Sequence, residues 1–491
     1  MGIARPEETW QLRIGGDWVT PRAGTYPVVN PATEEVVGHA PEATTDDAAD
    51  AIAAAREAFG SWSRTPRHER AALIRAAAER WRRREAEVVP LVQAETGATQ
   101  AVAASQQVPG CTNRLFEFAE LGLRDWDIPL LPSATPSSQL APGALLGAVA
   151  ARQPVGVVGC ITPYNFPLTN TAGKIGPALA MGNTVVIKPA PQDPLGTIEL
   201  VRVLDEVGFP PGVVNLLTGS KPEVGAALVD SPDVDMISFT GSTVVGAKIF
   251  EAGGRTMKRL LMELGGKGAA LVLADADLPN AVRNIMSVWA FHSGQICTAP
   301  TRVVAHRSIY HELVDGLAAA AGLLTTGDPL DPATVVGPVI SAAQRDRIES
   351  MIASGADAGA DVVVDGRRPE HLTKGFFVAP TLLAGCRNDM HVVREEIFGP
   401  VVVVVPVDDE EEGIAVSNDT SYGLYDYVFS RDTARAYQVA RRLRAGNVGI
   451  NTSGRNPGTP FGGFKMSGVG RDGARFGMEA YSELQSIVWP A

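Results

Sequence analysis

PVGVVGCITP (residues 154–163) is the first of four short apolar stretches that decide the fold, followed by NTVVIKPA (183–190), VVNLLTG (213–219) and VDMISFTG (234–241). Each is rich in β-branched residues and ends at a Pro, Ala or Gly, which is typical of buried strands. Helical patterns lie between them. Strands that alternate with helices predict a doubly wound α/β fold, in which helices cover both faces of a parallel sheet and ligands bind beyond the carboxyl ends of the strands.

The segments on either side of this region also carry patterns that predict secondary structure. The stretch GTYPVVNPATEEVVG (24–38) predicts a hairpin, and residues 44–97 and 106–123 carry helical patterns. A second α/β stretch runs from about residue 263 to about residue 446, and its Val-rich run at 401–405 predicts a buried strand.

Two segments do not fit this alternation. Residues 131–147 are rich in Ser, Pro and Gly, so we interpret them as a linker whose apolar end could form an edge strand. The tail AYSELQSIVWP (480–490) predicts a strand that pairs outside the main body.

Composition excludes several classes of function. A chain of 491 residues is long enough for two or three domains, and its net charge of −12 argues against nucleic-acid partners. No apolar run is long enough to span a membrane, and the start of the chain does not resemble a signal peptide. The four scattered cysteines suit a reducing cytoplasm, and the seven histidines show no spacing typical of metal ligands, so we expect no metal.

Two motifs contain residues suited to covalent catalysis. Cys297 lies in FHSGQICTAP (291–300), where it is either a nucleophile or a small buried hydrophobic residue. Glu263 ends an apolar run in MELGGKG (262–268), and the two glycines that follow allow a close approach of backbone or ligand. A carboxylate in such a run is either functional or held in a structural salt bridge.

Three further motifs lie at the ends of predicted strands. Asn165 in ITPYNFP (161–167) is either a donor to an oxyanion or an Asx-turn residue. The turn in FTGSTVVG (239–246) could bind an anion at a helix N-terminus or could be only a tight turn. The fifth motif, EEIFGPV (395–401), says little by itself.

Together, in this order, the five motifs resemble the aldehyde dehydrogenase superfamily. The resemblance covers essentially the whole chain, including PFGGFKMSG (460–468), and the spacing between Glu263 and Cys297 looks like the family's. It implies that Cys297 attacks an aldehyde to give a thiohemiacetal and then a thioester. Asn165 would stabilise the oxyanion with the backbone N–H of Cys297, and Glu263 would activate water. Lys174 would be a proton relay, although a surface helix charge is the alternative.

The resemblance also implies NAD or NADP as cofactor. Lys188 and Glu396 would bind its two riboses, Ser242 its pyrophosphate and Phe398 its nicotinamide ring. The remaining cofactor contacts would be Thr162, Pro163, Gly241 and Gly246. The sequence departs from many NAD-preferring members at Pro191, where they carry an acidic residue that repels a 2′-phosphate. We therefore expect both cofactors to be accepted, although Asp193 nearby could restore some discrimination.

The implied fold has three parts. Residues 1–130 and 150–262 would form a dinucleotide-binding domain, and residues 263–446 an α/β catalytic domain. Residues 131–149 and 470–491 would form a β arm that mediates a homodimer or homotetramer.

The substrate prediction depends on the residues expected around the aldehyde. Tyr164 lies next to Asn165, and Gly173 leaves room on its helix for a bulky group. Ile296 and Thr298 flank the nucleophile without charge, and no cationic residue obviously marks an acidic semialdehyde. We therefore expect a hydrophobic aromatic or terpenoid-like aldehyde.

Three rival functions remain open. A CoA-acylating enzyme of the same family is disfavoured by Glu263, which such members commonly lack. A cysteine hydrolase would need a base such as His292, but no orienting partner for it is evident. The third rival is a non-catalytic binding protein that keeps the fold.

Overall fold

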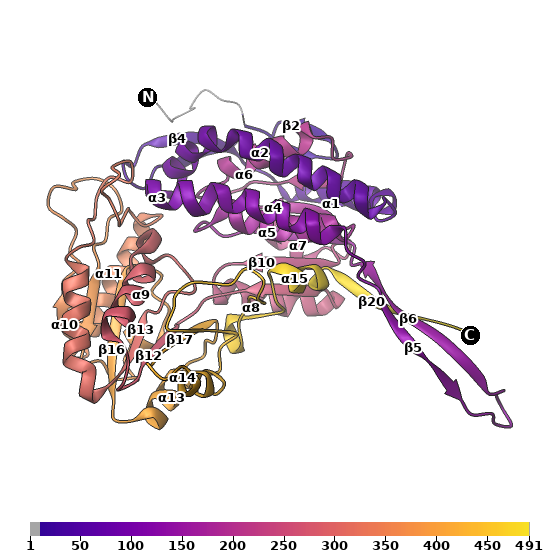
Figure 1. Cartoon of the computed structure of the whole chain (residues 1–491). Helices are drawn as coiled ribbons and strands as arrows, with labels where there is room; N and C mark the ends of the chain where they lie inside the picture. Colours follow the sequence, from indigo (N-terminus) through magenta and orange to yellow (C-terminus); the bar gives the residue numbers. More distant parts are fainter. Residues whose placement is uncertain (1–9, 491) are drawn as a thin grey trace.

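The computed structural model describes residues 10–490 and contains two α/β bodies and an extended β arm (Figure 1). Residues 1–9 and 491 lie outside the described part. These are the first nine residues of the predicted dinucleotide-binding domain and the last residue of the predicted arm. The expectation about the start of the chain therefore also concerns residues outside the described part.

The first body is built on an eight-stranded sheet. Its strands, in spatial order, are β19 (Gly468–Val469), β11 (Arg259–Glu263), β10 (Met236–Thr240), β7 (Val157–Ile161), β8 (Thr184–Lys188), β9 (Val214–Leu216), β1 (Leu12–Ile14) and β2 (Asp17–Val19). The five from β11 to β9 are parallel, and the edges are antiparallel. The four apolar stretches are therefore buried parallel strands, as the sequence predicted. The hairpin of β3 (Thr25–Val29) and β4 (Val36–Pro41) is also confirmed.

Helices cover both faces of this sheet, which confirms the doubly wound class. One face carries α2 (Arg67–Thr96), α4 (Val108–Gly122), α5 (Pro167–Ala180) and α6 (Leu195–Glu206); the other carries α1 (Thr45–Trp62), α7 (Glu223–Asp230) and α8 (Thr243–Gly253). The short elements are α3 (Gln100–Val102), the π-helix η1 (Ala103–Gln107), η2 (Gly254–Thr256) and α15 (Ala474–Ala480). Within residues 10–490, none of the helices has the length and apolar character needed to cross a membrane.

The second body has a seven-stranded sheet. Its strands, in spatial order, are β14 (Asp361–Val364), β15 (Thr381–Ala384), β16 (Val401–Val407), β13 (Arg302–His306), β12 (Ala269–Val272), β17 (Tyr425–Phe429) and β18 (Asn447–Ile450). All neighbours are parallel except β14 and β15. The last strand, β18, begins just beyond the point where we expected this α/β stretch to end.

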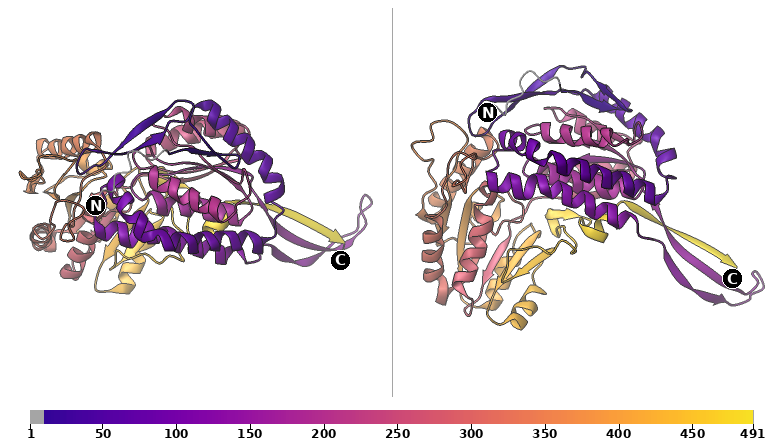
Figure 2. Two further views of the ribbon diagram at one scale, coloured as in Figure 1. Left: turned by 90° about the horizontal axis from the view of Figure 1, so that it is seen from above. Right: turned by 45° about the horizontal axis from the view of Figure 1, so that its top comes forward.

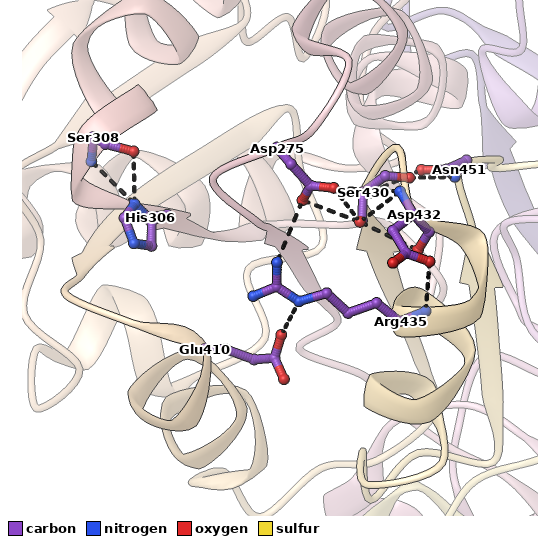
Figure 3. Close-up of polar contacts among 8 residues, drawn as sticks. All are labelled: Asp275, His306, Ser308, Glu410, Ser430, Asp432, Arg435 and Asn451. Carbon is purple, nitrogen blue, oxygen red and sulfur yellow. Dashed lines mark hydrogen bonds and ion pairs between the residues drawn. The ribbon is translucent and has the colours of Figure 1, made fainter.

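The connecting helices of the second body are α9 (Leu278–Trp289), η3 (Phe291–Gly294), η4 (Arg307–Ile309), α10 (Tyr310–Ala321), α11 (Ala342–Asp357), α12 (His391–Arg394), α13 (Glu410–Asn418), α14 (Thr433–Ala440) and η5 (Lys465–Ser467). A polar network fixes the end of β17 against its surroundings (Figure 3). Ser430 donates to Asp275 over 2.8 Å, and its backbone exchanges hydrogen bonds of 3.0 and 2.8 Å with the side chain of Asn451. The chain that follows β18 therefore starts from a fixed point.

The arm is a three-stranded antiparallel sheet that projects from the first body (Figure 2). It consists of β20 (Ser482–Pro490), β6 (Ala144–Pro154) and β5 (Ile128–Thr135) in that order. The predicted tail strand is confirmed, because β20 pairs with β6 along its whole length. The linker interpretation of residues 131–147 is wrong at its start, where residues 131–135 belong to β5, and only residues 136–143 lie between the strands. Its apolar end does form a strand, as we allowed, but β6 is the central strand of the arm and not an edge strand. Local composition missed β5 because its pairing partner is formed by a later segment.

Gly468 joins the C-terminal segment to β11 and offers a test of this architecture. Its φ is 144°, and a Cβ there would lie 2.0 Å from the carbonyl oxygen of Met262. Gly468→Ala should therefore lower the free energy of unfolding, measured by urea titration, by more than about 2 kcal/mol, because backbone strain and a clash add. Gly24→Ala is the matched control. Its φ is 79° but nothing lies within 4 Å, so only the strain of about 1–2 kcal/mol applies. Equal losses in the two variants would contradict the clash.

Candidate active site

Cys297 lies on a tight turn between α9 and β13. His292 and Ser293 in η3 have left-handed backbone with φ of 48° and 58°, which is costly for residues other than glycine. The hydroxyl of Ser293 donates to the carbonyl oxygen of Gly337 over 2.8 Å and holds the turn. Cys297 itself is half-buried, so its thiol is not a sealed core group.

Asn165 connects the end of β7 to this turn. Its side-chain amide donates to the carbonyl oxygen of Gln295 over 2.8 Å, and its own carbonyl oxygen accepts from Gln107 over 2.7 Å. The side-chain oxygen accepts from the backbone N–H of Phe166 over 3.0 Å. An amide nitrogen has two hydrogens. The side-chain amide of Asn165 is therefore held against Gln295, which lies two residues before Cys297, and one N–H donor is left for an oxyanion.

Glu263 ends β11 with a buried carboxylate that has no partner. Only 4% of the residue is exposed, and neither side-chain oxygen accepts a hydrogen bond from any residue in the described part of the chain. Burial, and then the charge of Asp472, raises the pKa of Glu263 well above its ordinary value, and Lys174 opposes this. The structural salt bridge that we kept open as the alternative is not formed. A carboxyl with a raised pKa is suited to general-base work near neutral pH.

The glycines after Glu263 bring three segments together. A Cβ at Gly266 would lie 2.4 Å from the carbonyl oxygen of Cys297, and a Cβ at Gly265 would lie 2.4 Å from a carboxylate oxygen of Glu396. The backbone N–H of Gly266 donates to Glu396 over 2.9 Å. Only glycine permits this approach.

The thiol of Cys297 is protonated in this environment. Burial, followed by the charges of Glu396 and Glu263, raises its pKa to about 12, and only Arg455 among the nearby charges opposes the shift. The thiol therefore needs a base before it can attack.

Lys174 is buried on α5, so the alternative of a surface charge is wrong. Its ammonium donates to Ser238 over 3.1 Å, and Tyr481 donates to the same hydroxyl over 2.7 Å. Burial lowers the pKa of Lys174, whereas Asp472 and Glu263 raise it. Lys174, Ser238 and Tyr481 thus form a chain of polar side chains that leads from the neighbourhood of Glu263 into the first body.

Of the residues predicted for NAD or NADP, those of the first body lie at or just after the carboxyl ends of its parallel strands, whereas Glu396 and Phe398 lie between α12 and β16 of the second body. The ammonium of Lys188 donates to the carbonyls of Pro189 and Gly219, both over 3.2 Å, and burial lowers its pKa to about 8. A third ammonium hydrogen stays available for a ligand. Ser242 caps α8, whose N-terminal amides suit a pyrophosphate.

The other predicted cofactor residues come from both bodies. Burial raises the pKa of Glu396 to about 7. Phe398 has left-handed backbone (φ 58°), and its ring lies edge-on to Tyr164 with centroids 5.9 Å apart. The backbone N–H of Thr162 donates to the carbonyl oxygen of Lys188 over 3.1 Å. Gly241 and Gly246 allow close packing on Phe239 and Leu264, and Pro163 is half-buried at the end of β7.

Sequence reasoning missed three residues of this region. The backbone carbonyl oxygen of Gln295 accepts from Asn165, the charge of Arg455 acts on Cys297, and Arg114 fills the space beside Gly173. Arg455 is the one cation between the fixed residue Asn451 and PFGGFKMSG (460–468), and this isolation was the available signal. His292 is buried, which lowers its pKa to about 4, and in the part of the chain described here it makes no hydrogen bond to Cys297. The described residues hold no group of three His, Cys, Asp or Glu that could bind a metal ion.

Comparison with known proteins agrees with this site. The model of the aldehyde dehydrogenase family matches residues 18–487. The chain belongs to the aldehyde dehydrogenase family. It is 37% identical over 481 residues to 3-succinoylsemialdehyde-pyridine dehydrogenase of a Pseudomonas species, covering 97% of this chain and 98% of that protein. It is likewise 37% identical to betaine aldehyde dehydrogenase of Bacillus subtilis over 97% of this chain and 96% of the other.

A solved structure of betaine aldehyde dehydrogenase from Staphylococcus aureus in complex with NAD+ is also similar. It is 34% identical, has a TM-score of 0.93 and matches 98% of this chain and 95% of its own. This protein is therefore an aldehyde dehydrogenase that uses a nicotinamide dinucleotide, and its non-catalytic alternative is not supported.

The raised pKa of Cys297 predicts how the free enzyme reacts with iodoacetamide. Between pH 7 and pH 10 the alkylation rate of Cys297, followed by mass spectrometry, should rise about tenfold per pH unit, because the thiolate fraction does so below the pKa. Glu396→Gln should speed the reaction at pH 9, since the pKa of Glu396 is about 7 and the wild-type carboxylate is then charged. Glu395→Gln, one residue away, is the control and should change the rate little. A plateau below pH 8 would contradict the prediction.

Proposed function

We propose that this enzyme oxidises an aldehyde to its carboxylic acid through a thioester on Cys297 that water hydrolyses, with NAD or NADP as cofactor. The observation that carries the proposal is the buried, unpartnered carboxylate of Glu263 beside a thiol that is itself held next to an amide donor.

The residues divide the reaction into two halves. In the first, the thiol of Cys297 loses its proton and its sulfur bonds to the aldehyde carbon, while Asn165 donates to the oxyanion. Bound NAD or NADP supplies the hydride acceptor that turns this adduct into a thioester. In the second half, Glu263 takes a proton from water, the water oxygen bonds to the carbonyl carbon, and the carbon–sulfur bond breaks to release the acid. Glu263 thus favours water over CoA as the acyl acceptor.

The expectation of a hydrophobic aromatic or terpenoid-like aldehyde is not carried further. It rested on open space beside Gly173, and that premise is wrong, because a Cβ at Gly173 would lie 2.6 Å from the guanidinium of Arg114. The relatives are named for betaine aldehyde, aminoaldehydes and a pyridine semialdehyde. These names differ so much that they do not decide the substrate of this chain.

We also propose a homodimer or homotetramer that assembles through the arm, in a cytoplasmic location. The arm exposes apolar side chains, among them Leu131 (91% exposed) and Trp489 (46%), and contiguous apolar surface of this kind marks an interface. The free state of all four cysteines supports a reducing compartment.

Glu263→Gln tests the hydrolytic half of the reaction. The variant should release about one equivalent of reduced cofactor per active site in a stopped-flow absorbance trace and then turn over at least about a hundredfold more slowly than wild type, because a general base typically contributes 10²–10⁴-fold. Cys297→Ala should give neither burst nor turnover. Normal steady-state turnover of Glu263→Gln, or a wild-type enzyme that needs CoA, would overturn hydrolysis by Glu263.

Pro191 predicts that both cofactors work. Asp193 is fully buried, and burial followed by the charge of Glu95 raises its pKa well above the ordinary value, so it does not supply the missing repulsion. We expect kcat/KM for NAD and NADP to differ by less than about a thousandfold, roughly 4 kcal/mol. Pro191→Glu should reduce kcat/KM for NADP more than for NAD, and Pro191→Gln is the uncharged control. A larger wild-type preference would contradict this expectation.

A further inference from the structure

Arg114 on α4 occupies the space that Gly173 leaves open on α5. The two helices pack side by side (Figure 1), and the 2.6 Å approach described above means that the guanidinium lies where a larger side chain on α5 would project. The nearest carboxylate, Asp472, is 3.9 Å away, at the outer limit of an ion pair. The guanidinium of Arg114 makes no hydrogen bond to any residue between 10 and 490. Its donors are therefore available to another group.

Arg455 approaches the same region from the loop after β18. Its guanidinium carbon lies 3.9 Å from the centre of the Phe461 ring, and within the described residues it has neither a hydrogen bond nor an ion pair. The residue as a whole is exposed, but its guanidinium is largely covered. Phe461 belongs to the apolar cluster against which Cys297 packs, and a Cβ at the next residue, Gly462, would lie 2.8 Å from a carboxylate oxygen of Glu263. Arg455 is therefore held close to the thiol and to Glu263, and its charge opposes the raised pKa of both.

The loop that carries Arg455 is held at both ends. Asn451 is paired with Ser430 (Figure 3), and the backbone N–H of Ser453 donates to Asn284 over 2.7 Å. At the far end, the backbone N–H of Phe461 donates to the carbonyl oxygen of Asp472 over 2.8 Å. Arg455 is thus presented from a fixed frame, which reduces the entropy cost of binding a ligand.

The two arginines repel each other, and Asp472 offsets part of this repulsion. The charge of Arg114 lowers the pKa of Arg455, in addition to the larger effect of burial. The carboxylates that face them are Asp472, whose side chain accepts from the backbone N–H of Gly473 over 2.6 Å, and Glu117, whose pKa is raised by burial. Arginine forks match carboxylates geometrically, so two guanidinium groups that share Asp472 and make no hydrogen bond within the described residues are suited to bind an anion.

We propose that the physiological substrate is an aldehyde with a carboxylate at its other end, and that Arg455 and Arg114 bind this carboxylate while the aldehyde reaches Cys297. The proposal rests on the proposed function, since it assigns the substrate class of the same site. It also separates this chain from the relatives named for betaine aldehyde and aminoaldehydes, because their cationic groups would meet two positive charges here.

The test compares aldehydes of similar size and different charge. We expect kcat/KM of the wild-type enzyme for succinic or glutaric semialdehyde to exceed that for neutral pentanal and for cationic betaine aldehyde by at least about tenfold, because one charge-assisted hydrogen bond contributes about 1.5–3 kcal/mol. Arg455→Met should raise KM for the semialdehydes by about ten- to a hundredfold with a smaller change in kcat. The loss for pentanal should be much smaller. Arg114→Met should act in the same direction. Arg441→Met, at an exposed site just after α14, is the control.

A second measurement does not need turnover. Glutarate should protect Cys297 of the wild-type enzyme from iodoacetamide, and Arg455→Met should abolish that protection. Failure of every aldehyde to be oxidised, with protection intact, would reject the proposed function but keep the carboxylate site. Faster oxidation of pentanal or betaine aldehyde than of the semialdehydes, equal losses for all aldehydes in Arg455→Met, or absence of protection would overturn the anionic substrate.

Discussion

The close approach of three chain segments at Gly265 and Gly266 is the constraint on which the active site depends. These glycines follow β11 of the first sheet and precede β12 of the second, so the crossing between the two bodies is made where side chains would not fit. The carbonyl of Cys297 and the carboxylate of Glu396 occupy the space that two Cβ atoms would fill. The proposed general base Glu263, the proposed nucleophile Cys297 and the predicted cofactor residue Glu396 therefore share one rigid junction, although each comes from a different part of the sequence.

Burial at this junction shifts the ionisable groups toward their neutral forms. It raises the pKa of Glu263, Glu396 and Cys297 and lowers that of Lys174 and Lys188. Each shift reflects a charged form that the fold destabilises, so the site reduces the stability of the folded protein. The same shifts make proton transfer possible near neutral pH, because a base such as Glu263 works best when its pKa approaches the working pH. Opening the junction to water would remove both the cost to folding stability and the pKa shifts that allow proton transfer.

The sequence predicted those features that depend on local pattern. Buried parallel strands and the tail strand follow from residue types within a few positions, whereas the roles of Cys297, Glu263 and Asn165 came from the family resemblance and stay predictions. The sequence did not predict elements that depend on a distant partner. Strand β5 forms by pairing with β6, which in turn pairs with β20, although β5 contains Pro129 and Pro132. Burial of Lys174 likewise depends on β10 and on the C-terminal segment that carries Tyr481. Structural features that depend on the local sequence could be predicted, whereas those that depend on packing between distant elements could not.

The relation between Gly173 and Arg114 shows why family resemblance does not reach the substrate. Taken alone, the glycine indicated empty space, but volume in a packed interior is filled by whatever the neighbouring helix supplies. Here α4 supplies a guanidinium, so the same glycine changes from evidence for a bulky apolar substrate into the condition for a charged site. In our proposal the reaction depends on the junction at Gly265 and Gly266, whereas charge preference depends on side chains on α4 and on the loop after β18. Because Arg114 and Arg455 lie outside the two glycines, replacing either arginine changes the charge offered to the substrate and leaves the crossing of the chain intact.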